Sequence, residues 1–276
     1  MPESPACYSL ASSALFGRLR GPYPLISDPL FYLAAIPAVF LFGVAKGGFG
    51  GGLGVVSVPL MGLVVSPVQA AAILLPILCL MDLFSLWAFR GRWKWPELRI
   101  LLPASLVGIA IGTLLFEHMS PPVLRLLLGG IAITFTLHHW LQGRRRKNRT
   151  PDLYPPVVGV LAGATAGFTS FIAHAGGPPV TMYLLRRGYD RTAFAGTTVF
   201  FFTCVNYSKL LPYAWLGQFD LSNLSTSLVL SPLAPIGVGA GVWLHRRVSD
   251  RFFFRVAYGM LFVVGLKLVY DGLLQF

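Results

Sequence analysis

Apolar runs separated by short polar or basic stretches recur from about residue 30 to the end of the chain. A membrane-spanning helix needs about 20 mainly apolar residues, and most of the runs approach this length. They are continuous rather than alternating, which excludes an outer-membrane β-barrel. The pattern predicts an all-α polytopic membrane protein with ten apolar segments, at residues 31–45, 55–65, 68–89, 100–116, 123–141, 157–173, 180–185, 192–215, 221–244 and 252–274.

Two of these segments, 55–65 and 180–185, are too short to cross a membrane as helices. Each follows a glycine cluster, at residues 50–52 and 176–177, and the second cluster is followed by two prolines. Glycine and proline interrupt helices, and non-helical backbone at membrane depth requires cover by protein or a polar cavity. We therefore expect eight full spans and two short, broken re-entrant hairpins, with ten spans as the upper limit.

The glycine clusters also mark an internal repeat with an offset of about 125 residues. When the two repeats are aligned at this offset, Asp82 falls next to the position of Asn206. Further along, Pro103, Gly108, Gly112 and Gly130 align with Pro232, Gly237, Gly241 and Gly259. This alignment predicts four regions: an N-terminal tail at 1–29, a first transmembrane repeat at 30–142, a basic cytoplasmic linker at 143–154 and a second transmembrane repeat at 155–276.

The distribution of positive charge indicates that the two repeats run in opposite directions. In the first repeat the loop at 90–99 is basic, whereas the connection at 118–122 has no Lys or Arg. In the second repeat the loop at 217–220 has none and the later loop at 246–251 is basic. Loops rich in Lys and Arg stay in the cytoplasm. Two inverted repeats of about five segments each follow, an architecture typical of secondary transporters.

Composition narrows the function classes. The chain is 55% hydrophobic and only 12% charged, with a mean hydropathy of +0.69. Soluble domains carry about 25% charged residues, so a soluble enzyme and a disordered chain are both excluded. The net charge of +12 lies in the loops, which favours contact with anionic lipid over nucleic-acid binding. Three widely spaced cysteines form neither a disulfide framework nor a metal site, and we expect no cofactor.

The glycine motifs resemble those of the TauE/SafE sulfite exporter family, also called the toluene-sulfonate uptake permease family. The resemblance rests on residues 46–52 leading to residues 58–60, on their echo at 174–179, and on Gly196, Thr197 and Asn206 downstream. Membership would imply a multi-pass transporter of the bacterial inner membrane for sulfur-containing anions such as sulfite, thiosulfate or organosulfonates. Because substrate and direction vary within the family, neither carries over to this chain.

Residues at the glycine turns and inside the apolar segments are candidates for a substrate site. Glycine turns would bring backbone N–H groups and the positive end of a helix to an oxyanion, and close helix packing is the alternative explanation. The mirrored pair of clusters, each beside a segment too short to span, favours a site. Lysines there would supply positive charge, the alternative for Lys46 being a side chain that extends to lipid headgroups. The substrate-binding candidates are Lys46, Gly50, Gly51, Gly52, His174, Gly176, Gly177, Asn206 and Lys209.

Asp82 is the acidic residue in the middle of a long apolar segment. Such a carboxylate must be paired, protonated or in contact with water. It would either couple transport to a proton or act as a structural partner of Lys46 or Lys209. His174 would bind the anion, carry a proton or be a buried structural histidine. Thr197 and its neighbouring threonines are expected to bond to their own helix.

Alternating-access transport of a small anion across the lipid bilayer is the leading functional hypothesis. A passive anion channel is the near alternative, because re-entrant hairpins also occur in channels. A membrane scaffold is a further alternative, as is an intramembrane enzyme using Ser170 and His174. The chain lacks a Gly-x-Ser-x-Gly motif and an orienting acid near this pair, so we expect no enzymatic activity. Homo-oligomerisation and the coupling ion stay open.

Overall fold

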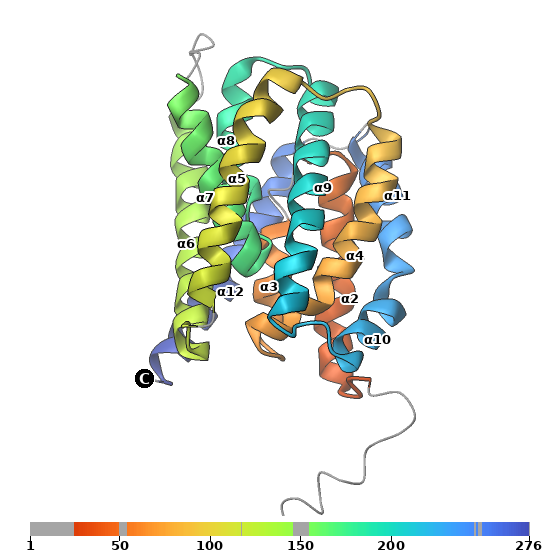
Figure 1. Ribbon diagram of the computed structural model, residues 1–276, viewed down its shortest axis with the longest axis vertical. Coiled ribbons are helices and arrows are strands. Elements are labelled where there is room, and N and C mark those ends of the chain that lie inside the picture. The colour runs from red at the N-terminus through yellow and green to blue at the C-terminus, as the bar shows by residue number, and fades with distance from the viewer. Residues whose placement is uncertain are drawn as a thin grey trace, which may run out of the picture.

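The computed structural model describes residues 25–49, 54–116, 118–145, 155–245, 247 and 250–275. Within these residues the chain is helical and has no strand, and Figure 1 shows the long helices lying roughly side by side along the vertical axis. The elements are α2 (Pro29–Val44), η1 (Ala45–Phe49), η2 (Gly54–Val56), α3 (Ser57–Met61), α4 (Pro67–Ala88), α5 (Trp95–Phe116), α6 (Pro121–Arg145), α7 (Pro156–Ala173), α8 (Gly177–Leu184), η3 (Leu185–Arg187), α9 (Arg191–Trp215), α10 (Leu221–Leu230), α11 (Leu233–His245) and α12 (Asp250–Leu273).

Short polar side chains mark where several helices begin. Ser66 caps α4 by accepting a hydrogen bond from the Gln69 N–H, and a proline follows as the first helical residue. Asp190 caps α9 and Asp220 caps α10 in the same way, through N–H groups two or three residues later. These caps satisfy N–H groups that lack a partner within the helix, so the polar loops set the helix boundaries.

The predicted all-helical class is confirmed, with one difference in the second half. Residues 221–244, predicted as a single segment, form two helices that are bent by 45° between α10 and α11. Pro232 lies at the break, where it cannot continue the hydrogen-bonding pattern of α10. The two short segments are also short in the structure, since α3 has five residues and α8 has eight.

Within the described residues, four helical segments are long and apolar enough to cross a membrane, and the bent pair α10–α11 would make a fifth. Large apolar side chains on their outer surfaces are open to the surroundings, including Leu33 and Leu228, which are 74% and 73% exposed. Such a surface suits lipid. The total number of spans stays a prediction. The four segments are Pro29–Gly48, Pro67–Ala88, Trp95–Phe116 and Pro156–Ala173.

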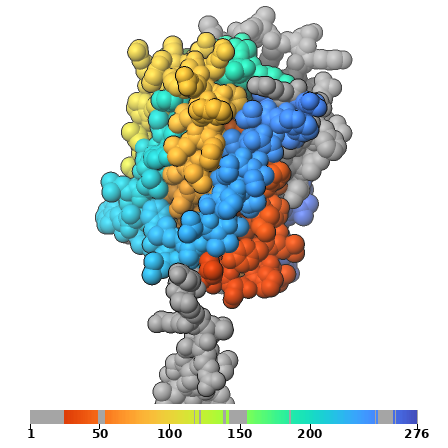
Figure 2. Space-filling model, turned by 90° about the vertical axis from the view of Figure 1, so that its right-hand side faces the viewer, coloured from red at the N-terminus to blue at the C-terminus, as the bar shows by residue number. Residues whose placement is uncertain are grey.

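Helices from the two predicted repeats pack against each other in an exchanged pattern. The first helix of each repeat lies along the fourth segment of the other, so α2 packs on α11 and α7 on α5. Figure 2 shows α10 and α11, in blue, between α2 in red and α4 in orange. Glycines allow these close approaches: a Cβ on Gly108 would overlap the Ala164 carbonyl, and one on Gly241 would overlap the Val44 carbonyl. Two related halves would produce this exchange, while their inversion stays a prediction.

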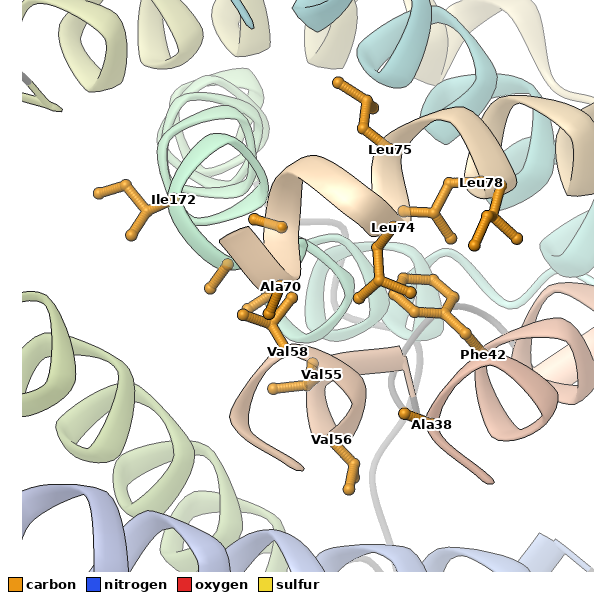
Figure 3. Close-up of a cluster of buried hydrophobic side chains, with 14 of the residues drawn as sticks. Ala38, Phe42, Val55, Val56, Val58, Ala70, Leu74, Leu75, Leu78 and Ile172 are labelled. Carbon is orange, nitrogen blue, oxygen red and sulfur yellow. The ribbon is translucent and has the colours of Figure 1, made fainter. Parts of the chain in front are cut away.

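The broken segment after α2 is packed between α2 and α4. Val55 and Val58 belong to the same buried apolar cluster as Phe42 of α2 and Leu74 of α4 (Figure 3). A hydrogen bond of 2.7 Å from the Ser57 hydroxyl to the carbonyl of α2 at position 38 holds the segment as well. The non-helical backbone is therefore covered by protein, as membrane depth requires.

Candidate substrate-binding site

The two helices that lead into the glycine clusters both end in backbone with positive φ. In η1, Gly48 has a φ of 142°, which glycine adopts readily. At the end of α7, His174 has a φ of 50°, in the left-handed region that residues other than glycine seldom adopt. Backbone of this kind is concentrated at functional sites. The ends of α2 and α7 are therefore where a site is expected.

Lys46, in η1, forms a buried ion pair with Asp82 of α4. The two side chains are 6% and 0% exposed, so Lys46 does not extend to lipid headgroups. The second carboxylate oxygen of Asp82 accepts a hydrogen bond of 2.7 Å from Nδ2 of Asn206 in α9. A buried carboxylate needs a positive partner and hydrogen bonds, and Asp82 has both. It joins the broken helix to both long helices at one point.

Lys209, one turn beyond Asn206 on α9, is completely buried. Its ammonium donates to the hydroxyl and carbonyl oxygens of Ser170, both at 3.0 Å, and to Nδ1 of His174 at 2.7 Å. These acceptors match the three hydrogens of an ammonium group. Nε2 of His174 lies 2.9 Å from the carbonyl oxygen of Ala71. We therefore assign the imidazole hydrogen to Nε2, with Nδ1 as acceptor, which makes His174 neutral.

The two lysines and one carboxylate leave an excess of positive charge in the interior. Asp82 neutralises Lys46, whereas in the described part of the chain no carboxylate lies within ion-pair distance of Lys209. With Lys209 assigned as an ammonium from its three acceptors and His174 assigned as neutral, the net charge of the cluster is +1. A buried, unneutralised cation is costly unless an anion joins it. The arrangement is thus suited to attract an anion.

A small cavity lies beside both polar groups. Its volume of about 20 Å³ holds roughly one water molecule. A sulfur oxyanion has four or more heavy atoms, so the cavity in this conformation is smaller than such an anion. The cavity is lined by Phe42, Lys46, Ser170, His174, Gly177, Phe202 and Asn206.

The predicted glycine turns contribute less to the lining of the cavity than the charged and polar side chains do. Gly50, Gly51 and Gly52 lie outside the described residues. Gly176 is a packing position, because a Cβ there would press on the Ala166 carbonyl. Gly177 begins α8 and lines the cavity.

The start of α8 is poorer in hydrogen-bond donors than the glycine motif suggested. Pro178 and Pro179 follow Gly177 and have no N–H groups, so this helix start offers few backbone donors to an anion. Side-chain cations therefore dominate the electrostatics of the site.

Sequence reasoning treated Ser170 only as a candidate nucleophile. In the structure Lys209 lies between Ser170 and His174 and donates to both, so the two do not form the arrangement of a nucleophile and its base. Phe42 and Phe202, which lie on two different helices, also line the cavity. Nothing in the sequence distinguishes them from the other apolar residues of these helices. The threonines behave as expected: Thr197 donates to the carbonyl oxygen one turn earlier.

A second buried charged cluster lies where α5 begins, against the connection between α8 and α9. Glu97 accepts a hydrogen bond of 2.8 Å from the Tyr189 hydroxyl, and its other oxygen lies 3.2 Å from Nε of Arg187. Arg187 donates to the Tyr183 hydroxyl and stacks on its ring. Burial and the bond to Glu97 raise the pKa of Tyr189 to about 12, so its hydroxyl keeps its hydrogen. The cluster joins the two predicted repeats.

Apolar outer helices around a buried, positively charged site define a polytopic membrane transport protein. The chain belongs to the sulfite exporter TauE/SafE family, whose model matches residues 35–268. It is 26% identical over 247 residues to the probable sulfite/organosulfonate exporter TauE of Cupriavidus necator, an alignment covering 87% of this chain and 94% of that protein. No solved structure matches it. The family predicted from the glycine motifs is confirmed.

Proposed function

We propose that this protein is a secondary transporter of small sulfur-containing anions, such as sulfite, thiosulfate or an organosulfonate, in the bacterial inner membrane. Family membership supports the class, and the name of the Cupriavidus relative, a probable sulfite/organosulfonate exporter, supports the substrate. The observation that carries the proposal is the buried cluster of Lys46, Asp82 and Lys209, with its net positive charge beside a cavity.

The transport cycle we propose is alternating access between two inverted halves, residues 30–142 and 155–276. The exchanged packing of α2 on α11 and of α7 on α5 supports two halves that move against each other. The site lies where they meet, since Asn206 of α9 bonds to Asp82 of α4. A cavity too small for the anion at this point suits a carrier, whose site changes shape as the two halves move.

The test is flux of labelled sulfite and thiosulfate into proteoliposomes that contain the purified protein. Lys46→Met and Lys209→Met are each expected to reduce flux at low substrate at least tenfold, because a contact with a charged group is worth about 1.5–3 kcal/mol. Lys267→Met is the matched control, since this lysine on α12 is 55% exposed and pairs with Asp271. It should retain wild-type flux.

Three results would contradict this proposal. Flux that is linear in substrate and shows no exchange with substrate on the opposite side would indicate the channel alternative. Wild-type flux in both buried-lysine variants would place the substrate elsewhere. No flux of any sulfur anion would show that this protein does not transport this class of substrate.

A further inference from the structure

Asp82 occupies the position that a transported anion would be expected to take. Its carboxylate binds the Lys46 ammonium next to the cavity, and a sulfonate or sulfite oxygen would seek that same ammonium. We infer that Asp82 takes the place of the substrate in the empty site, an inference that rests on the proposed function. A divalent anion then binds only together with one proton, which Asp82 takes up.

The charge count leads to this requirement. The empty site carries +1, from Lys46, Lys209 and Asp82. A monovalent sulfonate brings it to zero. A divalent anion would bring it to −1, and an uncompensated buried charge is strongly unfavourable. One proton on the Asp82 carboxylate restores zero.

Asp82 is the group in the cluster whose contacts allow a proton to be added. His174 already uses both ring nitrogens, one as an acceptor from Lys209 and one towards the Ala71 carbonyl. Lys209 has three acceptors around its nitrogen, so we assign it as an ammonium, which has no position for a further hydrogen. The ionisable groups around Asp82 are Lys46 on η1, Cys79 on α4, and Cys204, Tyr207 and Lys209 on α9. His174, at the end of α7, lies near Lys46 and Lys209.

Asn206 is suited to serve both forms of the carboxyl group. Its amide nitrogen donates to ionised Asp82 in the structure. A carboxamide also has an acceptor oxygen, which can receive a hydrogen bond from a protonated carboxyl after the amide turns over. A second carboxylate at this position would instead repel Asp82 and cancel the positive charge that attracts the anion.

The proton step balances simply. A proton from the water on the side of entry forms an O–H bond with one carboxylate oxygen of Asp82, which releases Lys46 to the anion. On the opposite side the anion leaves, the O–H bond breaks, the proton passes to water and the ion pair reforms. A divalent anion with its proton and a monovalent anion alone therefore carry the same net charge of −1 across the membrane.

Calorimetry on the purified full-length protein in detergent tests the inference with two anions of constant charge near neutral pH. Thiosulfate is divalent and ethanesulfonate is monovalent. Titrations in buffers with different heats of ionisation count the protons taken up. We expect one proton per thiosulfate and none per ethanesulfonate. Linkage then predicts that thiosulfate affinity falls about tenfold per pH unit as pH rises, while ethanesulfonate affinity stays constant.

Asp82→Asn is expected to bind thiosulfate without proton uptake and with an affinity that does not depend on pH. Asp271→Asn is the matched control, since this carboxylate is paired to a lysine outside the site, and it should keep one proton per thiosulfate. If the Asp82 variant does not fold, the wild-type proton count still tests the requirement for a proton, because thiosulfate binding without proton uptake would overturn it.

The outcomes separate the two proposals. Anion binding that depends on Lys46 and Lys209 but takes up no proton with thiosulfate would overturn the role of Asp82 and leave the transport function standing. Proton uptake that persists in Asp82→Asn, or one proton taken up with ethanesulfonate, would also overturn it. Failure of both anions to bind, or binding unchanged in both lysine variants, would overturn the proposed function itself.

Discussion

The buried pair of Lys46 and Asp82 should be strongly coupled in the stability of the protein. In the described residues Asp82 is the carboxylate in contact with Lys46, and both side chains lie away from water. Removing one partner of a buried pair leaves an uncompensated charge and costs about 3–5 kcal/mol. Asp82→Asn and Lys46→Met should each lower the free energy of unfolding by that amount. The double variant should lose much less than their sum, because neither charge remains.

Thermal unfolding in detergent, followed by tryptophan fluorescence, measures this coupling. At roughly 2–4 °C per kcal/mol, each single variant should lower the Tm by about 6 °C or more. The pair Lys267–Asp271 on α12 is the matched control, with side chains 55% and 25% exposed, and its coupling should be about 0–1 kcal/mol. Additive losses at Lys46 and Asp82, or losses no larger than those at the exposed pair, would refute the reasoning.

Two further predictions concern other parts of the fold. Gly108→Ala should lower the Tm by several degrees, because the added Cβ would overlap the Ala164 carbonyl and overpacking costs about 1–3 kcal/mol. Gly130→Ala, with open space around its Cα, is the control, and equal effects would contradict this packing. Tyr189→Phe should lower the Tm equally at neutral and mildly alkaline pH. Because its pKa is raised from 10.0 to about 12, the stabilisation should be present below pH 10 and lost as the pH rises from there to about 12, so a loss below pH 10 would contradict the bond to Glu97.

Most of the helices could be predicted because their boundaries are set by residues close by in the sequence. The segment predicted at 68–89 corresponds to α4 (Pro67–Ala88), and that at 192–215 to α9 (Arg191–Trp215). In both cases an apolar run begins at a capping residue, so composition and capping coincide. The bend between α10 and α11 was missed although Pro232 signals it. A proline inside an apolar run is tolerated in membrane helices when neighbours satisfy the freed carbonyl, so its presence alone does not decide between a bend and a straight span.

The site was only partly predictable, since its contacts join residues that are far apart in sequence. A polar residue within an apolar segment is visible from the sequence, and Lys46, Asp82, Asn206, His174 and Lys209 were all identified in this way. Which lysine pairs with the carboxylate depends on the rotation of α4 against α9 and on the path of η1, which are set by tertiary packing. The sequence left both lysines open as partners, and the structure pairs Lys46 with Asp82.

The two predicted repeats make the same kind of contact with donor and acceptor exchanged. In the first half the lysine lies at the end of the first helix and its acceptor, Asp82, on α4. In the second half the lysine lies on α9 and its acceptors, Ser170 and His174, at the end of the first helix. Only the first of these acceptor sets is ionised. A repeat that conserved charge as well as geometry would have a neutral centre, with no reason to attract an anion. The excess positive charge thus arises where the two halves differ. The same difference leaves one carboxylate, Asp82, that is able to release its lysine to a substrate anion.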